Sequence, residues 1–174
     1  MPEKEEQVVA SILERYPYLS DHLHISRRQR IYADPLPRRE FEEVFDYLTS
    51  EGGFYTLKLI IGVDDGDDLG ILYPLTNGDK ILLLMKQRVP KANPVIRSVY
   101  SRFPSILWYE REIVDLFGVI VEELPPGPTY PLPDGWPAGN YPLRKEWKVE
   151  YFDKKTMTYN PPQPKENEAT DKEV

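Results

Sequence analysis

The sequence contains no cysteine and only two histidines among its 174 residues. Without cysteine the chain has neither disulfides nor a thiolate ligand for an iron–sulfur cluster. His22 and His24 cannot by themselves complete a structural zinc site, and their spacing predicts a surface pair on a strand. We therefore expect the chain to bind no cofactor of its own, so that any redox centre belongs to a partner.

Long apolar runs and excess positive charge are also missing. No apolar run approaches the roughly 20 residues that a membrane-spanning helix needs. The first residues, MPEKEEQVV, are acidic, which predicts no secretory signal and an intracellular location. The net charge of −7 argues against binding to nucleic acid or to an anionic membrane surface. We expect proteins as partners.

Motifs of common catalytic sites are absent as well. The sequence has no glycine-rich phosphate loop, no GxSxG and no HExxH, so nucleotide binding, serine hydrolysis and zinc proteolysis lack support. One loop contains four aspartates: Asp64, Asp65, Asp67 and Asp68. The register of an EF-hand calcium loop does not fit them. We interpret them as a solvated hairpin loop.

Alternating apolar residues predict three strands, at 54–63, 69–75 and 80–89. Residues 77–78, Asn-Gly, suit a tight hairpin turn between the last two, because both tolerate a positive φ. Residues 24–34, rich in arginine on one side, predict a further exposed strand. The strands indicate an antiparallel meander.

Helical periodicity and end signals predict four helices: 3–16, 37–50, one beginning at Pro94 after an Asn93 cap, and one from Pro104 to Phe117. Gly118 is placed to take the left-handed position that ends the last helix. The pattern predicts an α+β domain over residues 1–122, with a mixed or antiparallel sheet and flanking helices.

Beyond Val121 the pattern changes, because prolines, glycines and aromatics occur together without a period. Residues 123–159 are therefore predicted to form an extended, proline-rich arm that binds a partner. Residues 160–174 are polar and predict a flexible tail.

Residues 108–118, WYEREIVDLFG, combine four charged residues and three aromatics within about three helical turns. Arg111 and Asp115 lie four positions apart and can form an ion pair on a helix. One interpretation is an amphipathic core helix with salt bridges. The other is a protein interface with an aromatic core and a charged rim.

The segment 110–119, EREIVDLFGV, resembles the signature of the complex I 30 kDa subunit family, which includes the C-type subunit of bacterial enzymes and counterparts in membrane-bound hydrogenases. Gly139 followed by PLRKEW at 142–147 resembles a second sequence element of the same family. The segment 86–99, KQRVPKANPVIRSV, resembles the strand and turn before the signature. The resemblance covers roughly residues 40–150.

The resemblance implies a non-catalytic accessory subunit in the peripheral arm of a membrane-bound, ion-translocating oxidoreductase, on the cytoplasmic face of the membrane. It implies docking to the large catalytic (D-type) subunit beside the small iron–sulfur (B-type) subunit, with membrane subunits contacted indirectly. Iron–sulfur clusters and nickel–iron chemistry would belong to those partners. The residues carried over to the partner interface are Trp108, Glu110, Arg111, Glu112, Asp115, Phe117, Gly118, Pro142, Leu143, Arg144, Lys145 and Trp147.

One departure from the family pattern separates its branches. Complex I members usually place a histidine–proline step and two arginines soon after the signature glycine, whereas residues 124–128 here read LPPGP. This favours a group 4 [NiFe] hydrogenase or a related ferredoxin-linked complex. The same role in an NADH- or ferredoxin-quinone oxidoreductase, or in a sulfur-reducing relative, stays open. A free-standing enzyme using Glu110 and Glu112 for acid–base catalysis is the alternative of another class.

Overall fold

The computed structural model describes residues 4–162. Its centre is a mixed sheet of six strands, in the order β1-β2-β6-β5-β3 with β4 also paired to β5. The strands are β1 (Leu23–Arg27), β2 (Arg30–Ala33), β3 (Thr56–Leu57), β4 (Ile61–Asp64), β5 (Asp68–Thr76) and β6 (Leu82–Pro90). β5 and β6 pair antiparallel along their whole length, whereas β2 runs parallel to β6. The predicted meander is therefore the core of the sheet.

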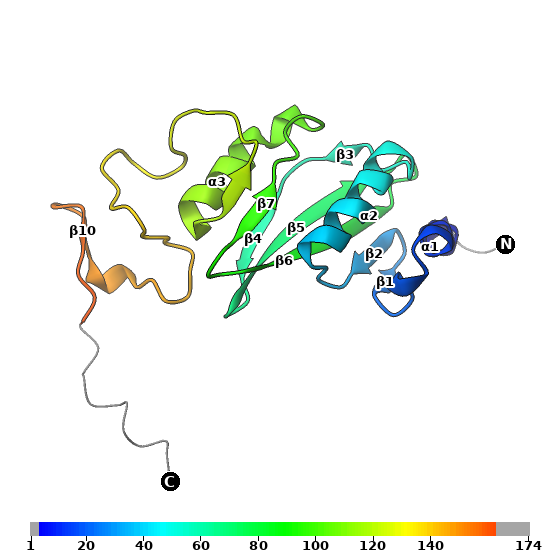
Figure 1. Cartoon of the computed structure of the whole chain (residues 1–174), viewed down its shortest axis with the longest axis horizontal. Helices are drawn as coiled ribbons and strands as arrows, with labels where there is room; N and C mark the ends of the chain where they lie inside the picture. Colours follow the sequence, from blue (N-terminus) through cyan, green and yellow to red (C-terminus); the bar gives the residue numbers. More distant parts are fainter. Residues whose placement is uncertain (1–3, 163–174) are drawn as a thin grey trace, which may run out of the picture.

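Helix α2 (Arg38–Ser50) lies on one face of this sheet, and helix α1 (Lys4–Arg15) packs at the edge of the sheet beside β1 (Figure 1). The apolar stripe of α2 brings the Phe41 and Phe45 rings to 4.7 and 5.5 Å from the Tyr73 ring of β5. All three side chains are buried, because alternate residues of β5 face the helices. The core therefore sits between α2 and the sheet.

A second, smaller unit follows β6. Strand β7 (Val95–Arg97) pairs parallel with β8 (Ile120–Glu122). The short 3₁₀ helix η2 (Pro104–Ile106) and helix α3 (Leu107–Phe117) connect them. The predicted helix from Pro94 is wrong, since β7 occupies that position. The β-branched side chains of Val95 and Ile96 favour an extended strand, and the Ile120 amide donates to the Pro94 carbonyl at 2.8 Å.

Two predicted strands are divided in the structure. Residues 24–34 form the β1–β2 hairpin, with Gln29 at a φ of 59° in its turn. Residues 54–63 form β3 and β4, because Leu57 pairs with Leu75 but Ile61 pairs with Leu72. The segment from Leu57 to Ile61 thus advances four residues while β5 advances three. The extra residue interrupts the hydrogen-bond ladder between them.

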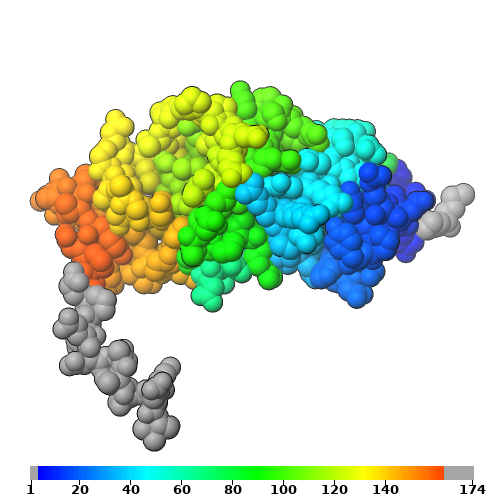
Figure 2. All heavy atoms as spheres, viewed as in Figure 1, coloured from blue at the N-terminus to red at the C-terminus, as the bar shows by residue number. Residues whose placement is uncertain are grey.

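Residues 123–159, called the arm below, pack against α3 at one end of the molecule (Figure 2). Their regular structure comprises the 3₁₀ helix η3 (Val149–Tyr151) and the two-residue strands β9 (Phe152–Asp153) and β10 (Thr158–Tyr159). The predicted tail lies outside the described residues from position 163 onward. Within residues 4–162, no helix has the length and apolar character that crossing a bilayer requires.

Candidate partner-binding site

Helix α3 carries the first of the two sequence motifs and ends as predicted at Gly118. This glycine has a φ of 69°, and its amide donates to the Val114 carbonyl at 2.9 Å. A Cβ at this position would lie 2.3 Å from the Tyr141 ring of the arm. Gly118 therefore combines the left-handed helix end with a close contact that a side chain would block.

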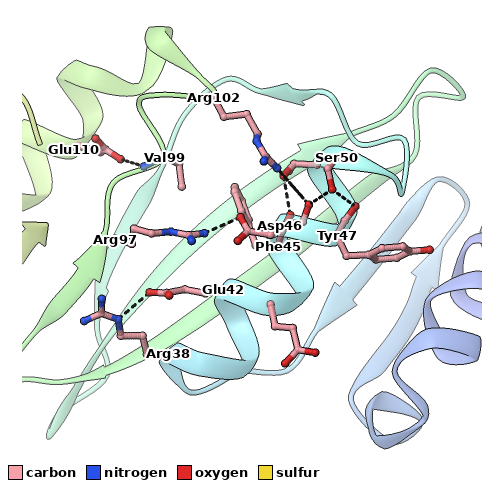
Figure 3. Close-up of polar contacts among 12 residues, drawn as sticks. Arg38, Glu42, Phe45, Asp46, Tyr47, Ser50, Arg97, Val99, Arg102 and Glu110 are labelled. Carbon is pink, nitrogen blue, oxygen red and sulfur yellow. Dashed lines mark hydrogen bonds and ion pairs between the residues drawn. The ribbon is translucent and has the colours of Figure 1, made fainter. Parts of the chain in front are cut away.

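Glu110 is fully buried and connects α3 to the end of β7. Its carboxylate accepts hydrogen bonds of 2.7 Å from the Ser98 hydroxyl and from the Val99 amide, and Figure 3 shows it pointing back toward Val99. Burial raises the pKa of Glu110, although both hydrogen bonds act in the opposite direction. A carboxylate with no exposed surface offers no route for a substrate, which argues against acid–base catalysis by this residue.

Arg111 is also buried, and it binds the arm. Its guanidinium donates to the Pro125 carbonyl at 2.7 Å and to the Pro128 carbonyl at 3.1 Å. Gly127 lies against the guanidinium so closely that a Cβ would come within 2.2 Å of it. The predicted ion pair with Asp115 is wrong, because Asp115 instead accepts the Tyr130 amide at 2.7 Å. Arg111 and Asp115 of α3 therefore both bind main-chain groups of the arm.

The second motif, PLRK, folds onto the end of α3. The Leu143 amide donates to the Leu116 carbonyl at 3.1 Å, and Arg144 Nε donates to the Phe117 carbonyl at 2.6 Å. The guanidinium of Arg144 also lies 4.5 Å from the centre of the Tyr141 ring. The last carbonyls of a helix are free to accept such bonds. The tertiary structure thus brings the two motifs together.

Asp64 is an arm contact that sequence reasoning missed. Its side chain is only 3% exposed, and it accepts hydrogen bonds from Lys91 Nζ and the Lys145 amide, both at 2.8 Å. Burial by itself would raise the pKa of Asp64, but these bonds and one from the Gly66 amide lower it to about 2. The solvated-loop prediction is therefore wrong for Asp64. No local pattern in the sequence connects Asp64 with Lys145, which lies 81 positions further along the chain.

A salt bridge and a hydrogen bond join α2 to the β7–α3 unit. Arg97 at the end of β7 binds the Asp46 carboxylate at 2.7 Å, and Arg102 donates to the Asp46 carbonyl at 3.3 Å. Figure 3 shows both arginines reaching toward α2. Half-exposed ion pairs contribute little individually, of order 0–1 kcal/mol each. Together they orient α3 relative to the sheet.

An aromatic pair remains exposed where α3 meets the arm. The rings of Trp108 and Tyr130 lie 5.1 Å apart at 61°, yet their side chains are 49% and 44% exposed. Beside them, α3 and the arm enclose a groove of about 800 Å³, lined partly by Pro126, Trp136 and Tyr141. Monomeric proteins usually bury tryptophan more deeply.

The twelve predicted interface residues differ in exposure. Those exposed to solvent are Trp108, Leu143 and Lys145. Those half-buried are Glu112, Asp115, Gly118, Pro142, Arg144 and Trp147. Those buried within the chain are Glu110, Arg111 and Phe117. The exposed residues can contact another protein. The buried residues Glu110 and Arg111 instead bind other segments of this chain and so hold α3 in place.

Neither histidine takes part in this site. His22 and His24 lie 3.4 and 3.2 Å from the Asp34 carboxylate, and both are about half-exposed, which confirms the predicted surface pair. Hydrogen bonding to His24 lowers the pKa of Asp34. Across residues 4–162, no three side chains of histidine, cysteine, aspartate or glutamate are grouped so as to hold a metal ion.

The fold is that of a small α+β protein. At its site the aromatic side chains of Trp108 on α3 and Tyr130 in the arm are exposed to solvent. Residues 35–153 match the family described as the respiratory-chain NADH dehydrogenase 30 kDa subunit. The chain belongs to this family, whose members are subunits of membrane-bound respiratory and hydrogenase-like complexes.

Individual relatives support the assignment. The chain is similar to the C-type subunit of F(420)H(2) dehydrogenase from Methanosarcina mazei, with 31% identity over 81% of this chain and 90% of that one. The beta subunit of the membrane-bound hydrogenase from Pyrococcus furiosus is also 31% identical, over 83% and 87%. A chain of the archaeal membrane-bound sulfane sulfur reductase aligns with a TM-score of 0.73 and 25% identity, covering 84% and 87%.

Proposed function

We propose that this chain is a non-catalytic subunit of the cytoplasmic peripheral arm of a membrane-bound, ion-translocating oxidoreductase of the hydrogenase type. There it docks the large catalytic subunit beside a small iron–sulfur subunit, and it contacts membrane subunits indirectly. The nickel–iron and iron–sulfur centres belong to those partners. The likeness to the Pyrococcus hydrogenase subunit over most of both chains supports this branch.

The observation that carries the proposal is the exposed Trp108–Tyr130 pair. An interface loses most affinity when a central tryptophan or tyrosine is removed, because such side chains bury a large apolar area at low entropic cost. The pair is fixed in place, since Arg111 lies 5.9 Å from the Trp108 ring and also binds the arm. A rigid, half-exposed aromatic pair is suited to insertion into a pocket of the large subunit.

The other motif residues contribute to docking in two ways. Leu143 and Lys145 face solvent and meet the large subunit directly in this proposal. Glu110, Arg111 and Arg144 act indirectly, because they hold α3 and the arm in one arrangement. We therefore expect substitutions of this second group to affect the fold of the site first and the affinity second.

Affinity purification of the tagged chain from native membranes tests the proposal. Trp108→Ala should weaken association with the large subunit about 30-fold, corresponding to the roughly 2 kcal/mol of an interface hot spot. Tyr18→Ala is the matched control, because Tyr18 is equally exposed at 49% but lies away from α3. Unchanged recovery of the large subunit with Trp108→Ala, in a variant chain that still folds, would contradict docking at this pair.

A second candidate is the same docking role in a complex that reduces quinone or sulfur. The match to the family of the respiratory-chain NADH dehydrogenase subunit and the likeness to the sulfur reductase chain favour it. The sequence of the co-purified large subunit separates the two candidates. A hydrogenase partner keeps two CxxC pairs for nickel and iron, whereas a partner without them places the chain in the second group.

A further inference from the structure

The two central strands of the sheet are apolar on both faces, although the helices cover only one. Residues 81–85 of β6 and its approach read ILLLM, and β5 contains Leu72 and Pro74 between its buried positions. An antiparallel sheet with one solvated face normally alternates apolar and polar residues, whereas strands buried on both faces have continuous apolar runs. The sequence of β5 and β6 is thus typical of a sheet covered on both sides.

The uncovered face is continuous across four strands. Register places Leu72 of β5 beside Ile61 of β4, and Leu84 of β6 beside Pro74 and Tyr32. Tyr32 and Ile61 are 40% and 43% exposed, and the residues between them are half-buried. We call this surface the open face: Tyr32, Ile61, Leu72, Pro74, Leu82 and Leu84. It lies opposite α2, whose side chains cover the other face.

One end of the open face is strongly basic. The β1–β2 turn carries Arg27, Arg28 and Arg30, and Arg30 stands beside Leu82 of the open face. None of the ion pairs formed within residues 4–162 involves these three arginines. At the other end of the face, by contrast, Lys86 binds Asp65 at 2.5 Å. The hydrogen bond from the Gln29 amide lowers the pKa of the Glu5 carboxyl of α1, and Arg28, which lies near it, adds to this effect. In a chain with a net charge of −7, a turn with three arginines outside these ion pairs indicates an acidic partner.

We propose that the open face binds an amphipathic helix of a neighbouring subunit. The apolar stripe of that helix lies along β4, β5 and β6, and carboxylates at one of its ends meet the arginines of the β1–β2 turn. A helix on this face completes the three-layer arrangement in which both faces of a sheet are covered. This surface is separate from the Trp108–Tyr130 pair, so the chain contacts two different elements of its complex.

The absence of cysteine permits a direct test. Tyr32→Cys, Ile61→Cys and the control Tyr18→Cys are introduced singly, and maleimide labelling of each is compared between the isolated full chain and the complex purified from native membranes. We expect labelling at positions 32 and 61 to be at least tenfold slower in the complex, with position 18 unchanged. Equal rates at positions 32 and 61 in both samples would overturn the proposal. Trp108→Cys reports separately on the docking proposed above.

Cross-linking and charge reversal test the identity of the occupant. A photoreactive group attached to Tyr32→Cys in the complex should cross-link to an acidic, amphipathic helix of another subunit, as read by peptide mass spectrometry. Cross-links to a second copy of this chain or to lipid would overturn it. Replacing Arg27, Arg28 and Arg30 by Glu should restore labelling at position 61 at least fivefold, whereas Arg39→Glu on α2 should not. If the triple variant does not restore labelling, the proposal that carboxylates of the bound helix meet these arginines is contradicted.

Discussion

The sheet domain and the arm are held by different interactions. In the sheet domain, α2 buries aromatic and aliphatic side chains against β5 and β6, so apolar area removed from water supplies the stability. In the arm, side chains of α3 and the β4–β5 turn bind main-chain groups, as Arg111 does with Pro125 and Asp64 does with Lys145. These polar contacts attach the arm to the rest of the chain at defined points, while aromatic rings pack within the arm itself, as Trp136 does against Phe152 at 4.6 Å.

This difference explains which changes each region tolerates. Apolar packing is spread over many contacts, and its contribution to stability is measured by replacing a large buried side chain with a smaller one. A side chain that bonds the backbone fixes one conformation of a segment without regular structure, and its loss leaves donors or acceptors unpaired. Substitutions in the sheet domain should consequently reduce global stability, whereas those at the arm contacts should act more locally.

The largest effect is expected for Phe45→Ala. Phe45 is 2% exposed and its ring lies within 6.2 Å of the rings of Phe41, Tyr73 and Phe103. Loss of the ring should lower the free energy of unfolding by about 3–5 kcal/mol, which chemical denaturation measures. Tyr55→Ala, at a side chain that is 67% exposed, should change it by less than about 0.5 kcal/mol. Similar losses in both variants would contradict a core centred on α2.

Glu110→Ala should cost about 3 kcal/mol, because the Ser98 hydroxyl and the Val99 amide lose their acceptor in a buried site. Glu110→Gln keeps an acceptor and should cost less. Since burial raises the pKa of Glu110 above 4.5, the stability it contributes is present below that pH and falls as the pH rises through the raised value. The difference in the free energy of unfolding between wild type and Glu110→Gln should therefore decrease from pH 4 to pH 8, as chemical denaturation at each pH measures. A widening gap would contradict the raised pKa.

Asp64→Asn tests the arm contact through its pH dependence. The pKa of Asp64 falls from 3.8 to about 2 on folding, so its carboxylate stabilises the fold above pH 4 and loses this effect as the pH falls toward 2. The variant should be less stable by about 2 kcal/mol at pH 7, and the difference from wild type should be mostly lost as the pH falls through about 2. Asp67→Asn, at an exposed position of the same loop, is the control. An Asp64→Asn effect that persists unchanged at pH 2 would rule out the charge as its cause.

The smallest effect is expected for Gly118→Ala, about 1–2 kcal/mol, because a Cβ meets both a positive φ and the Tyr141 ring. Gly135→Ala separates the two causes, since Gly135 has a φ of 81° but open space around it. Hydrogen exchange of the Leu143 amide, bonded to Leu116, should accelerate only in Gly118→Ala. Equal acceleration in both variants would show that Tyr141 does not matter for this segment.

Regular periodicity made part of the fold predictable. The apolar stripe of residues 37–50 predicted α2, and two alternating runs predicted the β5–β6 hairpin; both are present. The tight Asn-Gly turn was wrong, because the loop runs from Thr76 to Leu82 and its residue with a positive φ is Lys80, at 64°. The helix predicted from Pro94 was wrong because a proline after asparagine resembles a helix start, while pairing of β7 with β8 favoured a strand. Local signals cannot report a pairing partner more than 20 residues away.

The sequence by itself determined the absence of thiolate chemistry, the α+β class and the two family motifs, because composition, period and motif spacing are local properties. Only the tertiary structure decided that Arg111 binds the arm instead of Asp115, and that Asp64 meets Lys145 across 81 positions of the chain. It also decided which exposed aromatics share a surface, and that one apolar face of the sheet is uncovered. These outcomes depend on how separate segments pack, which no local pattern encodes.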